Sequence, residues 1–142
     1  MKKKTISTLA IGALSALLLC PSAHAVEVAF EQDNNLPVVY LNVALKAGSV
    51  TDPLNQGGMT NFMGEMLLRG TKSRTKEQID LALDQMGARL EVETRAEALI
   101  LRGAVLTSQL EPYLKLVTEI VTEPSFPDKE IRKLKSEVVS GL

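Results

Sequence analysis

The stretch that decides the fold is GMTNFMGEMLLRGT, residues 58–71. Its apolar side chains recur at positions i, i+3, i+4, i+7 and i+8, which lie on one face of an α-helix; they are Met59, Phe62, Met63, Met66 and Leu67. Gly70 ends the pattern, because glycine commonly follows the last turn of a helix. The spacing therefore predicts a helix whose methionine stripe packs into the core and whose other face carries Asn61, Glu65 and Leu68.

The segments on either side predict one small α+β domain. Residues 38–45 (VVYLNVAL) are rich in β-branched and aromatic residues and predict a buried strand, and residues 47–58 carry the turn residues of a loop. A second helix opens with Thr75 and Gln78 in capping-box spacing and ends at Gly87. Residues 89–94 and 98–106 then predict an antiparallel pair of strands.

Two further helices complete the order of elements. Ser108 and Glu111 have the spacing of another capping box, and Asp128 is suited to cap a last helix that runs to the end of the sequence. This order predicts helices packed on one face of a mainly antiparallel sheet. Three strands leave open sheet edges, so we expect the natural domain to continue past Leu142.

The first 25 residues predict a secretory signal peptide. Three lysines precede an apolar run at residues 6–19, and Ala23-His24-Ala25 offers a cleavage site after Ala25. The apolar run is too short to span a membrane, and no later segment is apolar enough. We therefore expect a secreted or periplasmic protein whose mature domain is residues 26–142. The alternative is that Cys20 is lipidated and retained, although Leu19 stands where a lipobox has a small residue.

Cleavage after Ala25 changes the chemistry that the chain can perform. It removes three of the 16 basic side chains and none of the 17 acidic ones, so the mature chain is acidic and a nucleic-acid partner is not expected. It also removes Cys20 and His24, which are the one cysteine and the one histidine of the sequence. Disulfides, cysteine or histidine nucleophiles and conventional zinc sites are thereby excluded for the mature chain.

Residues 58–71 resemble the signature helix of the pitrilysin/insulinase family of zinc peptidases, the inverzincins. The surroundings agree, because a strand ends in Lys46-Ala47-Gly48-Ser49, a loop at residues 52–57 precedes the helix, and Phe126-Pro127 leads to a charged helix. The resemblance extends over residues 38–142 and implies the N-terminal part of the first domain of that family. It also implies the same α+β fold.

Active members of that family carry His-x-x-Glu-His on this helix, where two histidines bind zinc and the glutamate activates water. Laid on this sequence, the histidines fall on Asn61 and Glu65 and the glutamate falls on Gly64. A third ligand, a glutamate of the later helix, falls by the family's spacing on Gly141, with Glu137 one turn earlier. The resemblance thus implies that the catalytic and zinc positions are lost.

Other acidic residues have simpler interpretations. Asn61 and Glu65 offer oxygen ligands for Ca²⁺ or Mg²⁺, but two oxygens are too few for such a site, so we expect a solvated or interface-facing helix side. Glu91, Glu93 and Glu97 are expected on the polar face of a strand and its turn. The mixed charges of residues 128–137 predict an exposed helix surface.

The resemblance implies a non-catalytic subunit that helps an active zinc-peptidase subunit bind peptide. We expect no cofactor in this chain and zinc only in the active partner, and we do not expect the chain to be an enzyme by itself. The alternative is a stand-alone envelope binding or scaffolding protein with the same fold and no peptidase partner. An active peptidase with substitute ligands is disfavoured because the mature chain offers no imidazole.

Overall fold

The computed structural model describes residues 29, 31 and 36–141. The expected signal peptide and its cleavage site therefore lie outside the described residues. Residues 36–141 belong to one compact unit, and it is this unit that carries the signature helix.

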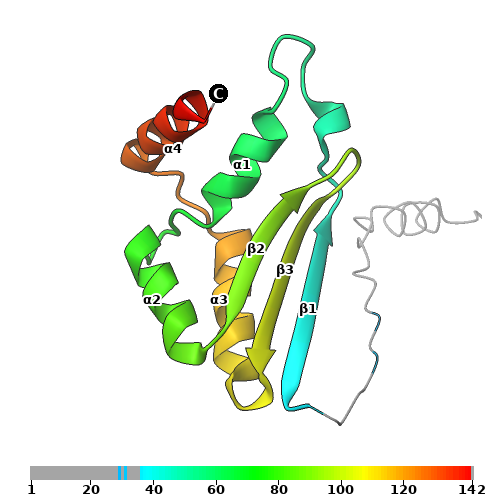
Figure 1. The fold of residues 1–142 in the computed structure, drawn as a ribbon, viewed down its shortest axis with the longest axis vertical. Coiled ribbons are helices and arrows are strands. Elements are labelled where there is room, and N and C mark those ends of the chain that lie inside the picture. The colour runs from blue at the N-terminus through cyan, green and yellow to red at the C-terminus, as the bar shows by residue number, and fades with distance from the viewer. Residues whose placement is uncertain (1–28, 30, 32–35, 142) are drawn as a thin grey trace, which may run out of the picture. The chain divides into compact units, whose positions relative to one another are not determined.

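Three antiparallel strands form the sheet, in the order β1-β3-β2 (Figure 1). Strand β1 is Val38–Leu45, β2 is Arg89–Thr94 and β3 is Leu99–Leu106. In the pairing register Val38 faces Leu106 and Leu45 faces Leu99, while β2 pairs along the other side of β3. The strand at residues 38–45 and the antiparallel pair are confirmed. The prediction that residues 38–45 are buried is wrong, because β1 is an edge strand whose residues are half-buried or exposed, and β2 is the other edge of this sheet.

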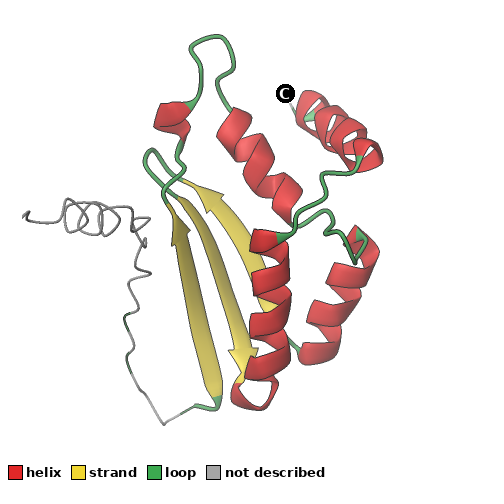
Figure 2. Cartoon of the chain, turned by 180° about the vertical axis from the view of Figure 1, so that it is seen from behind, coloured by secondary structure: helices red, strands yellow, loops and turns green. Residues whose placement is uncertain are grey.

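Helices α1 (Met59–Leu67), α2 (Lys76–Met86) and α3 (Leu110–Thr122) cover one face of the sheet, as Figure 2 shows from the helix side. Helix α4 (Asp128–Ser140) packs against α1. Short 3-10 turns, η2 (Ser49–Thr51) and η3 (Thr107–Gln109), follow β1 and β3. The α+β class is confirmed. None of the helices within residues 36–141 is long and apolar enough to cross a membrane.

The core lies between the sheet and these helices. Alternate residues of the strands point inward, because successive side chains of a strand face opposite sides. They meet the apolar stripes of the three covering helices. The buried core side chains include Leu90, Leu99, Leu101, Val105, Ile79, Met86, Tyr113, Leu116, Val117 and Ile120.

Tyr113 of α3 fills the centre of this core. Its side chain is fully buried, and its hydroxyl donates a hydrogen bond of 2.9 Å to the backbone oxygen of Arg89 on β2. Gly103 of β3 lies directly opposite, and a Cβ atom there would come within 1.6 Å of the Tyr113 hydroxyl oxygen. The absence of a side chain at position 103 is therefore what admits the tyrosine.

The helix ends agree with the sequence at one predicted capping box and differ at two other positions. Thr75 and Gln78 form the reciprocal capping box at the start of α2. The predicted box of Ser108 and Glu111 is wrong, because Ser108 lies inside the η3 turn and α3 begins only after Gln109. Asp128 is the first helical residue of α4 and not its cap, because the extended backbone of Pro127 takes the capping position.

The methionine stripe of α1 is only partly in the core. Met66 is 1% exposed, but Met59 and Met63 are 50% and 37% exposed, so the prediction that all three pack inside is wrong. The helix turns its Thr60 and Gly64 side toward the sheet, since small residues allow the closest approach, and this rotation moves two methionines outward. Leu114 of α3 is likewise 40% exposed, although it is a large apolar residue.

Replacing Gly103 by alanine should destabilise the domain by about 1–3 kcal/mol or more, because the new methyl group forces Tyr113 out of its place. Urea titration of the wild type and the variant gives the free energy of unfolding of each, and the difference measures this loss of stability. Gly57→Ala is the matched control, since a Cβ atom there meets nothing within 4 Å. Equal stability of Gly103→Ala and Gly57→Ala would contradict the close contact between Tyr113 and Gly103.

Candidate functional site

The loop before α1 sets the start of the signature helix. Gly48 packs on the turn between β2 and β3, where Ser49 N donates to Arg95 O at 3.0 Å and Val50 N donates to Ala96 O at 2.9 Å. A Cβ atom on Gly48 would lie 2.1 Å from the Ala96 oxygen, so glycine is required at this contact. The loop is thereby fastened to the sheet near its start, shortly after the end of β1.

Asp52 caps α1 from this loop. Its carboxylate accepts hydrogen bonds from Gly58 N at 2.8 Å, from Thr60 N at 2.9 Å and from the Thr60 hydroxyl at 2.5 Å. These bonds satisfy N–H groups that the first turn of a helix leaves without a partner. The Thr60 hydroxyl, followed by the backbone N–H groups, lowers the pKa of Asp52 below its ordinary value. The negative charge also suits the positive end of the helix dipole.

Gly64 is the point where α1 comes closest to the sheet. A Cβ atom there would lie 2.6 Å from Leu99 Cδ1 and 3.1 Å from Val92 Cγ1. Any side chain at position 64 would therefore have to displace Leu99, which is fully buried. The position assigned to the general base is occupied by a packing glycine that brings α1 onto β2 and β3.

Asn61 and Glu65 lie one turn apart on the exposed side of α1. The Asn61 amide nitrogen donates to Glu65 Oε1 at 3.2 Å. Arg69 lies beyond the end of α1, in the turn that follows Leu68. The structure thus brings Asn61 and Glu65 together as expected from the spacing, but as a hydrogen-bonded amide and carboxylate.

The acidic residues of α4 approach α1 at Arg69. Arg69 Nη2 donates to Glu137 Oε2 at 2.6 Å, and Nη1 lies 3.5 Å from Glu130 Oε2. The hydrogen bond from Arg69 lowers the pKa of Glu137 below its ordinary value. Glu130 is 5% exposed, so the prediction of a wholly exposed charged run at residues 128–137 is wrong at this position. Gly141 lies at the end of α4.

The donor set does not fit zinc. Asn61 contributes an amide, Glu65 contributes a single carboxylate, and Glu137 is already engaged by a guanidinium. Zinc sites in proteins are built from imidazole, thiolate and carboxylate ligands, and catalytic ones rely on two or three histidines. No step of metal-assisted hydrolysis can therefore be written for these side chains.

Arg69 and Asp52 are the site residues that sequence reasoning missed. Arg69 lies in the turn after α1, and its contact with α4 joins residues that are 61 positions apart, so no local pattern marks it. Asp52 follows the strand by seven residues, and its capping role depends on how the loop folds back. Only the tertiary structure shows that contact.

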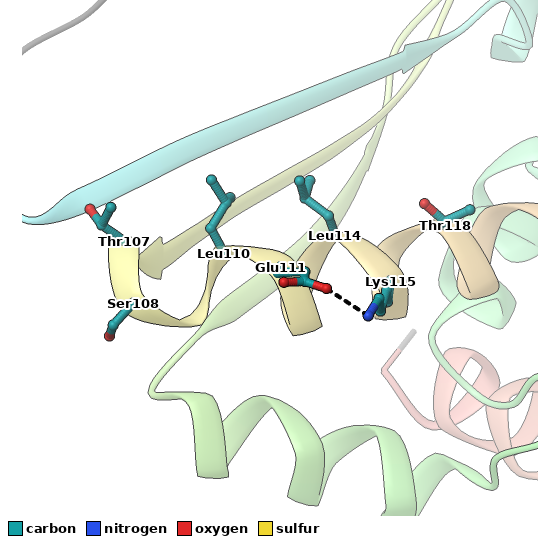
Figure 3. A pocket seen from close by; sticks show the side chains of 7 residues that line it. All are labelled: Thr107, Ser108, Leu110, Glu111, Leu114, Lys115 and Thr118. Carbon is teal, nitrogen blue, oxygen red and sulfur yellow. Dashed lines mark hydrogen bonds and ion pairs between the residues drawn. The ribbon is translucent and has the colours of Figure 1, made fainter.

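A groove of about 690 Å³ lies elsewhere, along the start of α3 (Figure 3). Leu110 and Leu114 point toward β1, while Glu111 and Lys115 form an ion pair of 2.8 Å on a different side of the helix. Every residue that lines the groove belongs to η3 or α3. It shares no residue with the signature helix.

Comparison with known families identifies the fold. The sequence pattern of the insulinase family, peptidase family M16, matches residues 27–140. The chain belongs to the insulinase family. The resemblance to this family, which rests on residues 58–71 and their surroundings, is thereby confirmed.

Relatives within the M16 family include forms whose names mark them as inactive. The non-peptidase homolog YmxG of Helicobacter pylori is 24% identical over 146 residues, 99% of this chain and 34% of that protein. A crystal structure of a peptidase M16 inactive domain from Pseudomonas fluorescens matches with a TM-score of 0.70 and 25% identity, over 75% of this chain and 26% of that chain. The human mitochondrial-processing peptidase subunit beta is 21% identical over 78% of this chain and 23% of that subunit. The chain thus spans a third or less of these relatives.

Replacing Asp52 by asparagine should destabilise the domain at neutral pH, because it removes the charge that caps α1. A carboxylate whose pKa is lowered in the folded state contributes stability above its unfolded pKa and loses it as the pH falls through the folded pKa. The difference between wild type and Asp52→Asn should therefore shrink as the pH falls below about 4, the ordinary range of an aspartate pKa.

Thermal unfolding between pH 7 and pH 2 measures this dependence. Asp84→Asn, on the exposed side of α2, is the control. A stability difference for Asp52→Asn that stays constant over the whole pH range would show that the charge of Asp52 does not stabilise the helix start.

Proposed function

We propose that this M16 chain is a non-catalytic subunit that helps an active zinc-peptidase subunit bind peptide. The observation that carries the proposal is the state of the signature helix, where Asn61, Gly64 and Glu65 stand in the three motif positions. Their arrangement supports it further, because the amide and carboxylate bond to each other and the glycine serves helix packing. The role left to such a chain is binding and positioning, which lowers the entropy cost of a partner's reaction.

The open edge of β2 supports a role in peptide binding. Within residues 36–141, β2 pairs with β3 on one side only, so backbone groups on its other side are available to an added strand. An extended peptide can bind such an edge through main-chain hydrogen bonds. The edge strand runs beside α1, since a Cβ atom on Gly64 would lie 3.1 Å from Val92 Cγ1 and 3.3 Å from Thr94 Oγ1 of β2. A peptide on this edge would therefore pass next to the signature helix.

The partner and the location are parts of the same proposal. One relative is named as a subunit of a processing peptidase, which supports a role for this chain within a larger assembly. The sequence of residues 1–25 supports export and cleavage after Ala25. In this proposal the partner subunit holds the zinc ion and this chain does not.

The purified protein should contain no stoichiometric zinc and should not hydrolyse a quenched fluorescent peptide, because its motif offers no imidazole. The variant Asn61→His/Glu65→His should gain zinc, since two imidazoles one turn apart can share a metal ion. Atomic emission spectroscopy after gel filtration measures the metal content, with Asn61→His alone as the control. One zinc per wild-type chain, or peptide hydrolysis by wild type, would refute the proposal.

Native purification tests the partner. We expect mild extraction from the cell envelope and mass spectrometry to recover a chain that begins at Val26, bound to a relative with an intact His-x-x-Glu-His helix. Recovery of the protein with no such relative would instead support the stand-alone binding or scaffolding role. Retention of residues 1–25, or a lipid on Cys20, would correct the proposed maturation.

A further inference from the structure

The guanidinium of Arg69, in the turn that follows α1, contacts two carboxylates of α4. The Arg69 side chain is 11% exposed, and its two terminal nitrogens contact Glu130 and Glu137, which lie seven residues apart along α4. The side chain of Glu130 is 7% exposed, whereas that of Glu137 is 47% exposed. The interaction therefore runs from a buried contact to the surface along the α1–α4 interface.

Burial makes this interaction different from the other ion pairs of the domain. Exposed pairs, such as Arg95 with Glu93, contribute little because water and salt screen them. Removing one member of a buried pair leaves an uncompensated charge and is strongly destabilising. The forked guanidinium can also bind two carboxylates in defined directions, which a lysine ammonium does less well. Arg69 thus contacts α4 at two points that lie seven residues apart, one buried and one exposed.

The apolar contacts of α4 are few. Leu134 is 1% exposed and Ile131 is half-buried, but Val138 and Val139 are 46% and 72% exposed. Other charged side chains lie at this interface. Lys76 of α2 and Lys133 of α4 lie near Glu137. Lys129 and Lys133 of α4 lie near Glu77 of α2. Compared with the core helix α3, α4 depends far more on charge for its position.

The turn into α4 holds a backbone strain. Phe126, between Pro124 and Pro127, has φ of 46°, a left-handed conformation that side-chain-bearing residues rarely adopt. Such a residue persists only where the surroundings hold it in place. Contacts with Gly70, which follows α1, hold the residues on either side of Phe126 in place. Ser125 N donates to Gly70 O at 3.1 Å, and a Cβ atom on Gly70 would lie 3.1 Å from Pro127 Cγ.

From these contacts we propose that α4 is a flap held closed on α1 by Arg69. The guanidinium offsets the strain at Phe126, and its loss releases α4 as a unit while the sheet and α1 to α3 remain folded. This device concerns only the described α1–α4 interface and does not depend on the proposed peptide-binding function. Release of the flap uncovers Arg69 and the last turn of α1, beside Glu65.

Hydrogen exchange on the intact protein, followed by mass spectrometry, tests the flap. Arg69→Met should speed exchange of the amides in residues 128–140 at least about tenfold, because an unpaired Glu130 disfavours the closed state. Exchange in β2, β3 and α3 should stay unchanged. Arg69→Lys should give an intermediate effect, and Arg95→Met, which removes an exposed pair, should leave α4 unchanged.

Two results would overturn the flap. The first is unchanged protection of α4 in Arg69→Met, and the second is an equal rise in exchange over the whole domain, which would make Arg69 a residue of global stability. Glu137→Gln serves if Arg69→Met does not fold, because it removes only the more exposed carboxylate. It should then speed exchange in residues 128–140 alone, and protection equal to wild type would refute the proposal.

Discussion

The close approach of α1 to the sheet at Gly64 is the contact on which the rest of the structure depends. A helix whose backbone comes this near to Leu99 and Val92 leaves no room for a side chain at the contact. The contact sets the rotation of α1, which sends Met66 into the core and leaves Met59 and Met63 on the surface. Asp52 and Gly48 then fasten the loop that leads into this helix.

The same rotation decides what the motif face can do. Asn61 and Glu65 lie one turn apart on α1, Arg69 lies in the turn after this helix, and each of the three belongs to a polar interaction. Asn61 and Glu65 bond to each other, whereas Arg69 reaches across to α4. In an active M16 peptidase the first two positions would be imidazoles. Here these residues join helices and present polar side chains, which is consistent with a chain that binds and positions.

Membership of the M16 family and absence of its catalytic residues are separate facts, and both bear on function. The family pattern covers residues 27–140, although Asn61, Gly64 and Glu65 stand in the motif positions of the signature helix. Within residues 36–141, β2 is an edge of the sheet and lies beside this helix. The groove along α3, by contrast, shares no residue with that helix.

The sequence by itself determined the elements and the family, because helical spacing, strand alternation and the Thr75–Gln78 capping box are local patterns. It also determined that Asn61, Gly64 and Glu65 occupy the signature helix. Only the tertiary structure decided which side of α1 faces the sheet, that η3 displaces the Ser108 cap, and that Glu130 is buried against Arg69. These outcomes depend on contacts between residues that are distant in the chain. Arg69 and Glu130, for example, are 61 positions apart, and no local pattern encodes such a contact.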